Sequence, residues 1–149
     1  MRSPRSLFRI VAIAEAVTWA LLLTGMFLKY VTQTTELGVR VFGMVHGIVF
    51  IAYCLSAVLV AVDQRWSRAR TLLALASSVP PFATLVLERY VERHEAAGVT
   101  WRLTAEDPRG LVEKVTAWLL RNPVHGALAG LVAVAVLTGV ALVVGPSAG

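Results

Sequence analysis

The sequence predicts an all-α fold: a polytopic membrane helix bundle of four transmembrane helices plus one short amphipathic interfacial helix. Hydrophobic residues make up 57% of the 149 positions, charged residues only 15%, and the mean hydropathy is +0.71. A soluble domain carries about 25% charged residues. The charges are also unevenly distributed, because long windows contain none. This distribution is typical of helices surrounded by lipid.

Four apolar windows have the composition of membrane spans. A hydrocarbon core of about 30 Å requires roughly 20 helical residues, and three of the windows reach that length. The third window is shorter, but its helix can continue past Glu88 to Gly98, a plausible C-terminal stop. The windows cover residues 7–28, 41–62, 71–87 and 124–144, and we assign all of them to a single membrane domain, residues 1–149.

The first window has a basic start, with Arg2, Arg5 and Arg9, as a cleaved signal peptide would. However, its apolar stretch is too long for a signal peptide, contains Glu15 and ends without a small-residue cleavage site. We therefore predict that it is a retained span.

An amphipathic helix is predicted over residues 108–121. Asp107-Pro108 is a good helix start, because proline fits the first helical position. Asn122-Pro123 then ends the helix. One apolar stripe, with Trp118 near its end, favours a helix in the headgroup region over one packed only on the rest of the protein. The stripe consists of Leu111, Val115, Trp118 and Leu119.

The net charge of +5 arises from 14 Lys and Arg against 9 Asp and Glu. The basic residues flank apolar segments, which suits lipid headgroups better than a phosphate backbone, so we predict a lipid bilayer as partner and no nucleic acid. Arginines in the N-terminal arm and in the loop at residues 63–70 predict, by the positive-inside rule, that both termini are cytoplasmic. Lys29, Arg40 and the basic residues of the segment 88–123 weaken that prediction.

Glu15 is the polar residue that most needs an explanation. It lies eight residues into its span, about 12 Å deep, where a charged carboxylate costs roughly 2.5–3.5 kcal/mol. Such a residue is expected to face the bundle interior and to be protonated or hydrogen-bonded.

The third window breaks at two prolines, which lack the N–H that a helix needs. The carbonyls of Ala76 and Ser77 should thereby lose their donors and require other partners. Depth matching brings side chains of three spans to this level. The predicted buried polar cluster, and candidate functional site, consists of Glu15, Tyr53, Ser77, Ser78, Pro80 and Pro81. It serves either to hold the helices together or to bind an ion, proton or ligand.

A second polar group is predicted at the opposite membrane face, where His46, Glu88 and Arg89 can form an interhelical clamp. Pairing of His46 with His125 as haem ligands is the weaker alternative, because no aromatic-lined gap accompanies them. Too few ligands are in view for zinc. We predict no catalytic residues, no metal and no cofactor, and we interpret Cys54 as a small packing residue.

Two small-xxx-small patterns allow helices to approach closely. They are Gly43-x-x-x-Gly47 and Gly126-x-x-x-Gly130. We predict that they pack helices within the monomer, and the second also offers a face for self-association.

Several motifs of the first three windows resemble a known family. They are Phe8-Arg9-Ile10-Val11-Ala12, Ala14-Glu15-Ala16, Trp19, Val45-His46-Gly47, Ser78-Val79-Pro80-Pro81-Phe82 and Glu88-Arg89. Over about residues 7–93, the chain resembles domain of unknown function 3817, a small bacterial integral membrane domain frequent in actinobacteria. The resemblance implies a multi-pass protein of the bacterial inner membrane and implies no activity.

The sequence lacks nucleotide-binding, triad and CxxC motifs. We therefore expect a non-enzymatic membrane component, either a homo-oligomer or an accessory part of a larger membrane complex. The alternative is a minimal channel or transporter for ions, protons or small solutes that uses Glu15 and the Pro80-Pro81 break.

Overall fold

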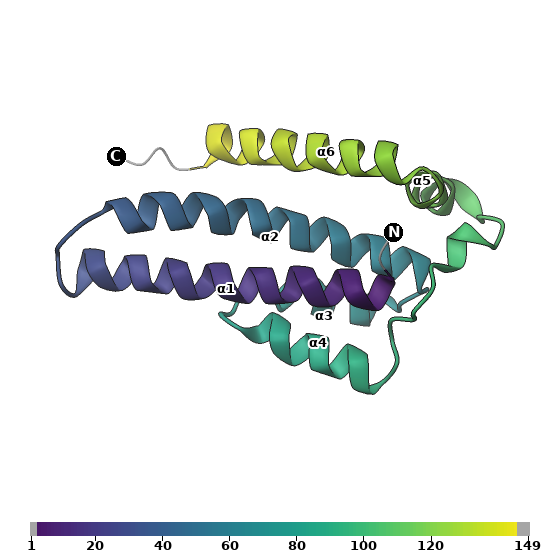
Figure 1. The fold of residues 1–149 in the computed structure, drawn as a ribbon, viewed down its shortest axis with the longest axis horizontal. Coiled ribbons are helices and arrows are strands. Elements are labelled where there is room, and N and C mark those ends of the chain that lie inside the picture. The colour runs from purple at the N-terminus through teal and green to yellow at the C-terminus, as the bar shows by residue number, and fades with distance from the viewer. Residues whose placement is uncertain (1–2, 146–149) are drawn as a thin grey trace.

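The computed structural model describes residues 3–145, and in this range the chain is helical, with no strand. Three helices are long and apolar enough to cross a membrane. Figure 1 shows them lying side by side along the longest axis of the molecule. The elements are α1 (Pro4–Tyr30), α2 (Leu37–Asp63), α3 (Arg68–Ala76), α4 (Ala83–Arg93), a 3-10 helix η1 (Arg102–Thr104), α5 (Gly110–Arg121) and α6 (Pro123–Val144).

The long helices α1 and α2 form an antiparallel pair (Figure 1). Ser3 caps α1 by accepting a hydrogen bond from the N–H of Ser6 at 3.1 Å, and Pro4 occupies the first turn, where its missing N–H is harmless. Near the connecting loop the two backbones meet at Gly25 and Gly38. A Cβ at Gly25 would lie only 2.7 Å from the carbonyl carbon of Gly38. Glycine at this position therefore permits the close approach of the pair.

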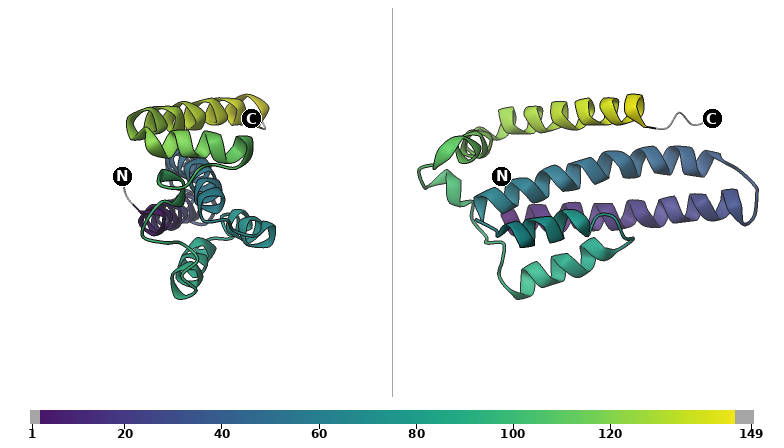
Figure 2. Two further views of the ribbon diagram at one scale, coloured as in Figure 1. Left: turned by 90° about the vertical axis from the view of Figure 1, so that its right-hand side faces the viewer. Right: turned by 180° about the vertical axis from the view of Figure 1, so that it is seen from behind.

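The predicted third span is wrong. Instead of one helix over residues 71–87, the chain forms two short helices, α3 and α4, and α4 ends at Arg93 rather than continuing to Gly98. The two form a hairpin beside α1 and α2, with its tip near the middle of α1, and α4 returns toward the end of the molecule where α3 begins (Figure 1, Figure 2). In the described chain, three helices of membrane-spanning length replace the four predicted.

The prolines explain the break. A residue that precedes proline is pushed away from helical geometry, and Pro80 and Pro81 cannot donate to the turn before them. The α-helix already ends at Ala76, and Phe82, which precedes α4, adopts the left-handed conformation with φ of 64°. This conformation reverses the chain within residues 77–82.

The amphipathic helix exists as α5, but it begins at Gly110, two residues later than predicted. It lies across the end of the bundle, and α6 then runs back along α2 (Figure 1). Thr116, Ala117 and Leu120 face inward, whereas Leu111 and Trp118 of the predicted stripe are exposed. This arrangement agrees with a helix that presents its apolar stripe outward.

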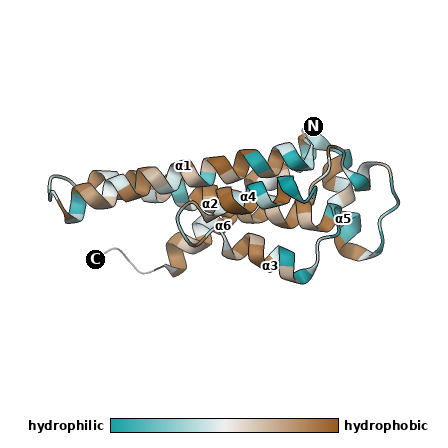
Figure 3. Cartoon of the chain, turned by 90° about the horizontal axis from the view of Figure 1, so that it is seen from below, coloured by the Kyte–Doolittle hydropathy of each residue, from teal (hydrophilic) through white to brown (hydrophobic). Residues whose placement is uncertain are grey.

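Because the α3–α4 hairpin replaces the predicted third span, the segment after α4 lies at the end of the bundle where α1 begins. With three long helices, the described chain starts and ends at opposite ends of the bundle, which does not agree with both termini lying on one side (Figure 1). Lys29 and Arg40 flank the α1–α2 loop, and hydrophilic residues gather mainly at the other end (Figure 3). The basic residues of that other end are Arg5, Arg9, Arg65, Arg68, Arg70, Arg89, Arg93, Arg102, Arg109, Lys114 and Arg121.

Candidate functional site

The contact between α1 and the hairpin is centred on Glu15, which is completely buried. Its Oε2 accepts a hydrogen bond of 2.9 Å from the hydroxyl of Thr84 on α4, and that hydroxyl also lies 3.2 Å from the carbonyl of Ala12. Oε1 has no hydrogen-bond partner among the described residues. A carboxyl group held in this way has one bonded oxygen and one left open.

Tyr53 and Ser77 join α2 to the end of α3. The buried hydroxyl of Tyr53 donates to the carbonyl of Ala74 at 2.9 Å and lies 3.0 Å from the hydroxyl of Ser77. Ser77 in turn donates to the same carbonyl at 2.7 Å. The structure therefore brings together the two residues that depth matching placed at one level.

The indole of Trp19 on α1 donates to the carbonyl of Ser78 at 3.2 Å. The prediction that the break frees the Ala76 carbonyl is wrong, because that carbonyl accepts from the N–H of Val79 at 3.2 Å. The side chains of Tyr53 and Trp19 instead donate to the carbonyls of Ala74 and Ser78. The Ala76 carbonyl is already bonded because the backbone before the prolines forms hydrogen bonds between residues three apart. The principle behind the prediction still applies, because backbone carbonyls at the break are bonded by side chains from α1 and α2.

The sequence pattern did not identify Thr84 or Trp19 as members of this site. Their spacing could have indicated both residues. Trp19 follows Glu15 by four residues and so shares its helix face, and Thr84 lies one turn after the prolines. Glu15 and the hairpin are thus joined, but through Thr84 rather than through Ser77 or Ser78.

The predicted clamp of His46 with Glu88 and Arg89 is wrong. The Nδ1 atom of His46 lies 2.9 Å from the hydroxyl of Thr18. The imidazole ring packs against the indole of Trp19, with 4.6 Å between the ring centres. Glu88 instead forms an ion pair of 4.0 Å with Arg9. The reason is the hairpin, which returns Glu88 and Arg89 to the end of the bundle where α1 begins.

Within the described chain, none of the four predicted packing glycines lies at a close contact between two long helices. A Cβ at Gly47 or Gly130 would meet nothing within 4 Å, and at Gly43 it would meet only the side chain of Leu22, at 3.8 Å. At Gly126 it would lie 2.4 Å from the carbonyl oxygen of Leu119, so this glycine permits the sharp α5–α6 connection. The close helix approach uses Gly25 and Gly38, which the motif search did not select.

A polar network that the sequence did not indicate fastens the segment after α4 to the end of α2. The carboxylate of Asp63, fully buried, accepts hydrogen bonds from the N–H groups of Arg102 at 3.0 Å and Leu103 at 2.8 Å. The guanidinium of Arg102 donates to the carbonyl of Asp63 at 2.6 Å and to Glu113 on α5 at 2.8 Å. We call this the Asp63–Arg102–Glu113 network.

We predict that acid weakens this network. Hydrogen bonds from the N–H of Arg109 and from the guanidinium of Arg102 lower the pKa of Glu113 below its ordinary value of 4.5. A carboxyl group whose pKa is lowered in the folded state stabilises that state. Its contribution is present above pH 4.5 and is lost as the pH falls through the lowered pKa. The protection factor of the Arg109 N–H in hydrogen exchange, taken relative to the intrinsic exchange rate at each pH, should fall over that range. Glu113→Gln, which cannot ionise, should remove this pH dependence; an unchanged profile in that variant would contradict the assignment.

The described residues contain no group of three or more His, Cys, Asp or Glu side chains placed to hold a metal ion. His125 lies beside Trp118, with 6.2 Å between the ring centres. Cys54 is half-buried and has a free thiol.

Comparisons with known proteins match the N-terminal part of the chain. A family model described as domain of unknown function (DUF3817) covers residues 5–93, which hold α1 to α4 and the buried polar groups. A Streptomyces coelicolor protein, described as a candidate membrane protein, is 52% identical over 87 residues, or 58% of this chain. The match is 10% of that relative, so the chain spans only a small part of its length. No solved structure matches.

Proposed function

This chain belongs to the family of domain of unknown function 3817, and from that premise we propose that it is a non-enzymatic membrane component, a homo-oligomer or an accessory part of a larger membrane complex. The length of the Streptomyces coelicolor relative supports a modular role, because there the matched segment is one part of a much longer chain. We further propose a location in the bacterial cell membrane.

The observation that carries the proposal is the exposure of α6. This helix has 22 residues, is apolar enough to cross a membrane, and none of its residues is buried within the described chain. Lipid tails are as apolar as its side chains, so burial from water does not hold α6 against its neighbours in a membrane. A helix of this kind is available for contact with another membrane helix.

A groove of about 780 Å³ between α6, α5 and α2 marks the face of α6 that is suited to such a contact. The α6 residues that line it are small, which lets helix backbones approach closely. They are Gly126, Ala129, Gly130 and Ala133. The polar groups of α1 to α4, in contrast, are largely bonded to one another and to backbone carbonyls, as structural contacts between helices are.

Purification from the native membrane in mild detergent, followed by native mass spectrometry, tests the proposal. We expect either a homo-oligomer or a stoichiometric complex with another membrane protein. A monomer without a partner at all accessible concentrations would contradict it.

We predict that Gly130→Leu disrupts this assembly while leaving the monomer folded. A Cβ at Gly130 would meet nothing within 4 Å in the monomer, and a leucine side chain there would keep a second helix from approaching. The matched control is Gly139→Leu, where an added Cβ also meets nothing within 4 Å and which lies about two and a half helical turns away, on the opposite face. Native mass spectrometry should show loss of the complex for Gly130→Leu only. Equal loss in both variants would exclude this face.

The unbonded Oε1 of Glu15 favours a second function, a minimal channel or transporter for protons or small solutes. A buried ionisable group in a membrane helix, beside a hairpin interrupted by Pro80 and Pro81, is a feature of proton and ion pathways.

Proton flux into liposomes separates the two functions. A transporter that uses Glu15 loses its flux in Glu15→Gln, which keeps the shape of the side chain but cannot ionise. Flux that is absent in the wild type, with a folded protein, leaves Glu15 as a contact between helices.

The basic residues also support an orientation. Apart from Lys29 and Arg40, the basic residues of the described chain lie at the end of the bundle that contains the start of α1, because the α3–α4 hairpin turns back. By the positive-inside rule we propose that this end is cytoplasmic and that α6 ends on the opposite side.

A further inference from the structure

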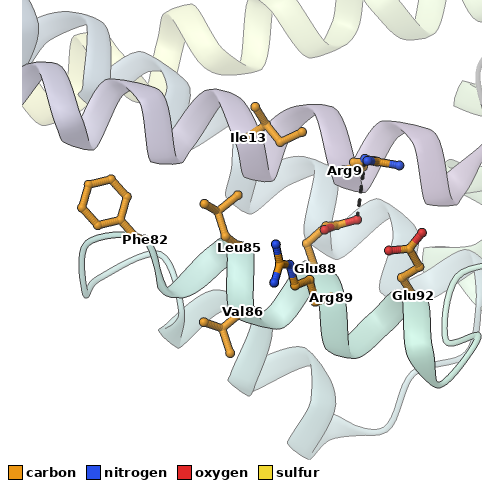
Figure 4. Close-up of a pocket in the computed structure, with 8 residues that line it drawn as sticks. All are labelled: Arg9, Ile13, Phe82, Leu85, Val86, Glu88, Arg89 and Glu92. Carbon is orange, nitrogen blue, oxygen red and sulfur yellow. Dashed lines mark ion pairs between the residues drawn. The ribbon is translucent and has the colours of Figure 1, made fainter.

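A second groove, of about 590 Å³, lies between α1 and α4. Its volume falls in the range of pockets that hold small molecules, roughly 300–1,000 Å³. Figure 4 shows that its walls differ along their length. Phe82 and Leu85 lie toward the tip of the hairpin, whereas Arg9, Glu88 and Glu92 lie toward the start of α1.

The apolar part of the groove lies at the depth of acyl chains. Phe82 precedes α4 at the hairpin tip, and Ile13 lies one turn deeper in α1 than Arg9. From Phe82 to Glu92 the helix rises about 15 Å, half the thickness of a hydrocarbon core. The groove therefore extends about 15 Å along α4, from the hairpin tip beside the middle of α1 toward the end of the bundle where α1 begins (Figure 1, Figure 4).

The polar part contains two cations and two anions. Arg9 and Glu88 are 4.0 Å apart, a long ion pair in which the Arg9 side chain is 59% exposed. Within the described chain, no ion pair involves Arg89 or Glu92. Beside the long Arg9–Glu88 pair, the surface end of the groove thus presents one guanidinium group and one carboxylate, Arg89 and Glu92, that have no ion pair among the described residues and can bind a ligand with charges of both signs.

We propose that this groove binds a phospholipid with a primary amine in its headgroup, such as phosphatidylethanolamine. Arg9 and Arg89 bind the phosphate, since guanidinium groups match phosphate oxygens in geometry and charge. Glu92, with Glu88 beside it, accepts hydrogen bonds from the ammonium group. One acyl chain lies along Ile13, Phe82, Leu85 and Val86. The balanced charges favour this lipid over an anionic one. The proposal requires that the chain lies in a membrane but not that it assembles.

Lipid retention in native mass spectrometry tests the proposal. The full chain, purified in detergent, is incubated separately with phosphatidylethanolamine, phosphatidylcholine and phosphatidylglycerol that have identical acyl chains. We expect phosphatidylethanolamine to be retained about tenfold more than phosphatidylcholine, because a trimethylated nitrogen cannot donate the charge-assisted hydrogen bond, worth about 1.5 kcal/mol. Equal retention of the three lipids, or a preference for phosphatidylglycerol, would overturn the proposal without any variant.

Two pairs of variants assign the headgroup contacts. Glu92→Gln should reduce retention of phosphatidylethanolamine to that of phosphatidylcholine, whereas Glu95→Gln, an exposed residue outside the groove lining, should not. Arg89→Gln should reduce the retention of both phosphatidylethanolamine and phosphatidylcholine, whereas Arg93→Gln should reduce the retention of neither. All four side chains are exposed, so none of these changes removes a buried contact. Equal losses in Glu92→Gln and Glu95→Gln would show that the effect is not specific to the groove.

Discussion

Gly25→Ala is expected to destabilise the α1–α2 pair strongly. The new Cβ would lie 2.7 Å from the carbonyl carbon of Gly38 and 2.8 Å from the nitrogen of Val39, both backbone atoms. Neither can move aside as a flexible side chain can, so the helices must separate. Overpacking of this kind costs about 1–3 kcal/mol. The measurement is thermal or detergent-induced unfolding of the purified chain, with a lower midpoint for the variant.

The matched control is Gly47→Ala, in the middle of α2. Its Cβ would meet nothing within 4 Å, and alanine favours the helical state over glycine by up to about 1 kcal/mol in water-exposed helices. The two changes are chemically identical and differ only in their surroundings. Gly25→Ala should therefore lower the unfolding midpoint, whereas Gly47→Ala should raise it or leave it unchanged. A similar loss in both would mean that the helices do not meet at Gly25.

Asp63→Ala is expected to release the segment between α4 and α5 from the end of α2. The change leaves the buried N–H of Leu103 and the half-buried N–H of Arg102 without their acceptor. An unsatisfied buried donor costs about 1–3 kcal/mol, so we expect a loss of about 2 kcal/mol for the two together. Trypsin cleavage after Arg102 should therefore be about thirtyfold faster in the variant, if cleavage follows local opening.

Asp107→Ala is the control for that experiment, because Asp107 is exposed in the same segment. It should leave the cleavage rate unchanged. The released segment contains only the short η1, so the circular dichroism of the whole chain should be nearly the same in both variants. Equal cleavage of the wild type and of Asp63→Ala would contradict the role of the Asp63–Arg102–Glu113 network.

The long spans could be predicted because membrane thickness sets helix length. The predicted windows 7–28, 41–62 and 124–144 lie within α1, α2 and α6. The prediction of a span over residues 71–87 was wrong because hydropathy indicates the solvent around a segment but not where the chain reverses its direction. Pro80-Pro81 was recognised as a break, but its consequence, a reversal through the left-handed Phe82, depends on contacts with α1 and α2.

The candidate site could be predicted in part. Glu15 is buried because a carboxyl group at that depth must avoid lipid, and this argument needs only the sequence. Its partner, Thr84, follows only once the hairpin places α4 beside α1. The same reversal separates His46 from Glu88. Asp63 was missed because a carboxylate at a span end is ordinarily solvated, and its burial arises from the loop that folds over it.

We propose that the chain crosses the membrane three times, with α1, α2 and α6, and that the α3–α4 hairpin returns to the side from which it enters. Cysteine labelling in sealed vesicles with a membrane-impermeant thiol reagent tests it most directly. In a Cys54→Ser background, single cysteines replace Ala69, Thr100 and Glu36, all of which are exposed. We expect Ala69→Cys and Thr100→Cys to react from one side and Glu36→Cys to react from the other. Reaction of Thr100→Cys from the same side as Glu36→Cys would contradict it, because α3 and α4 would then cross the membrane.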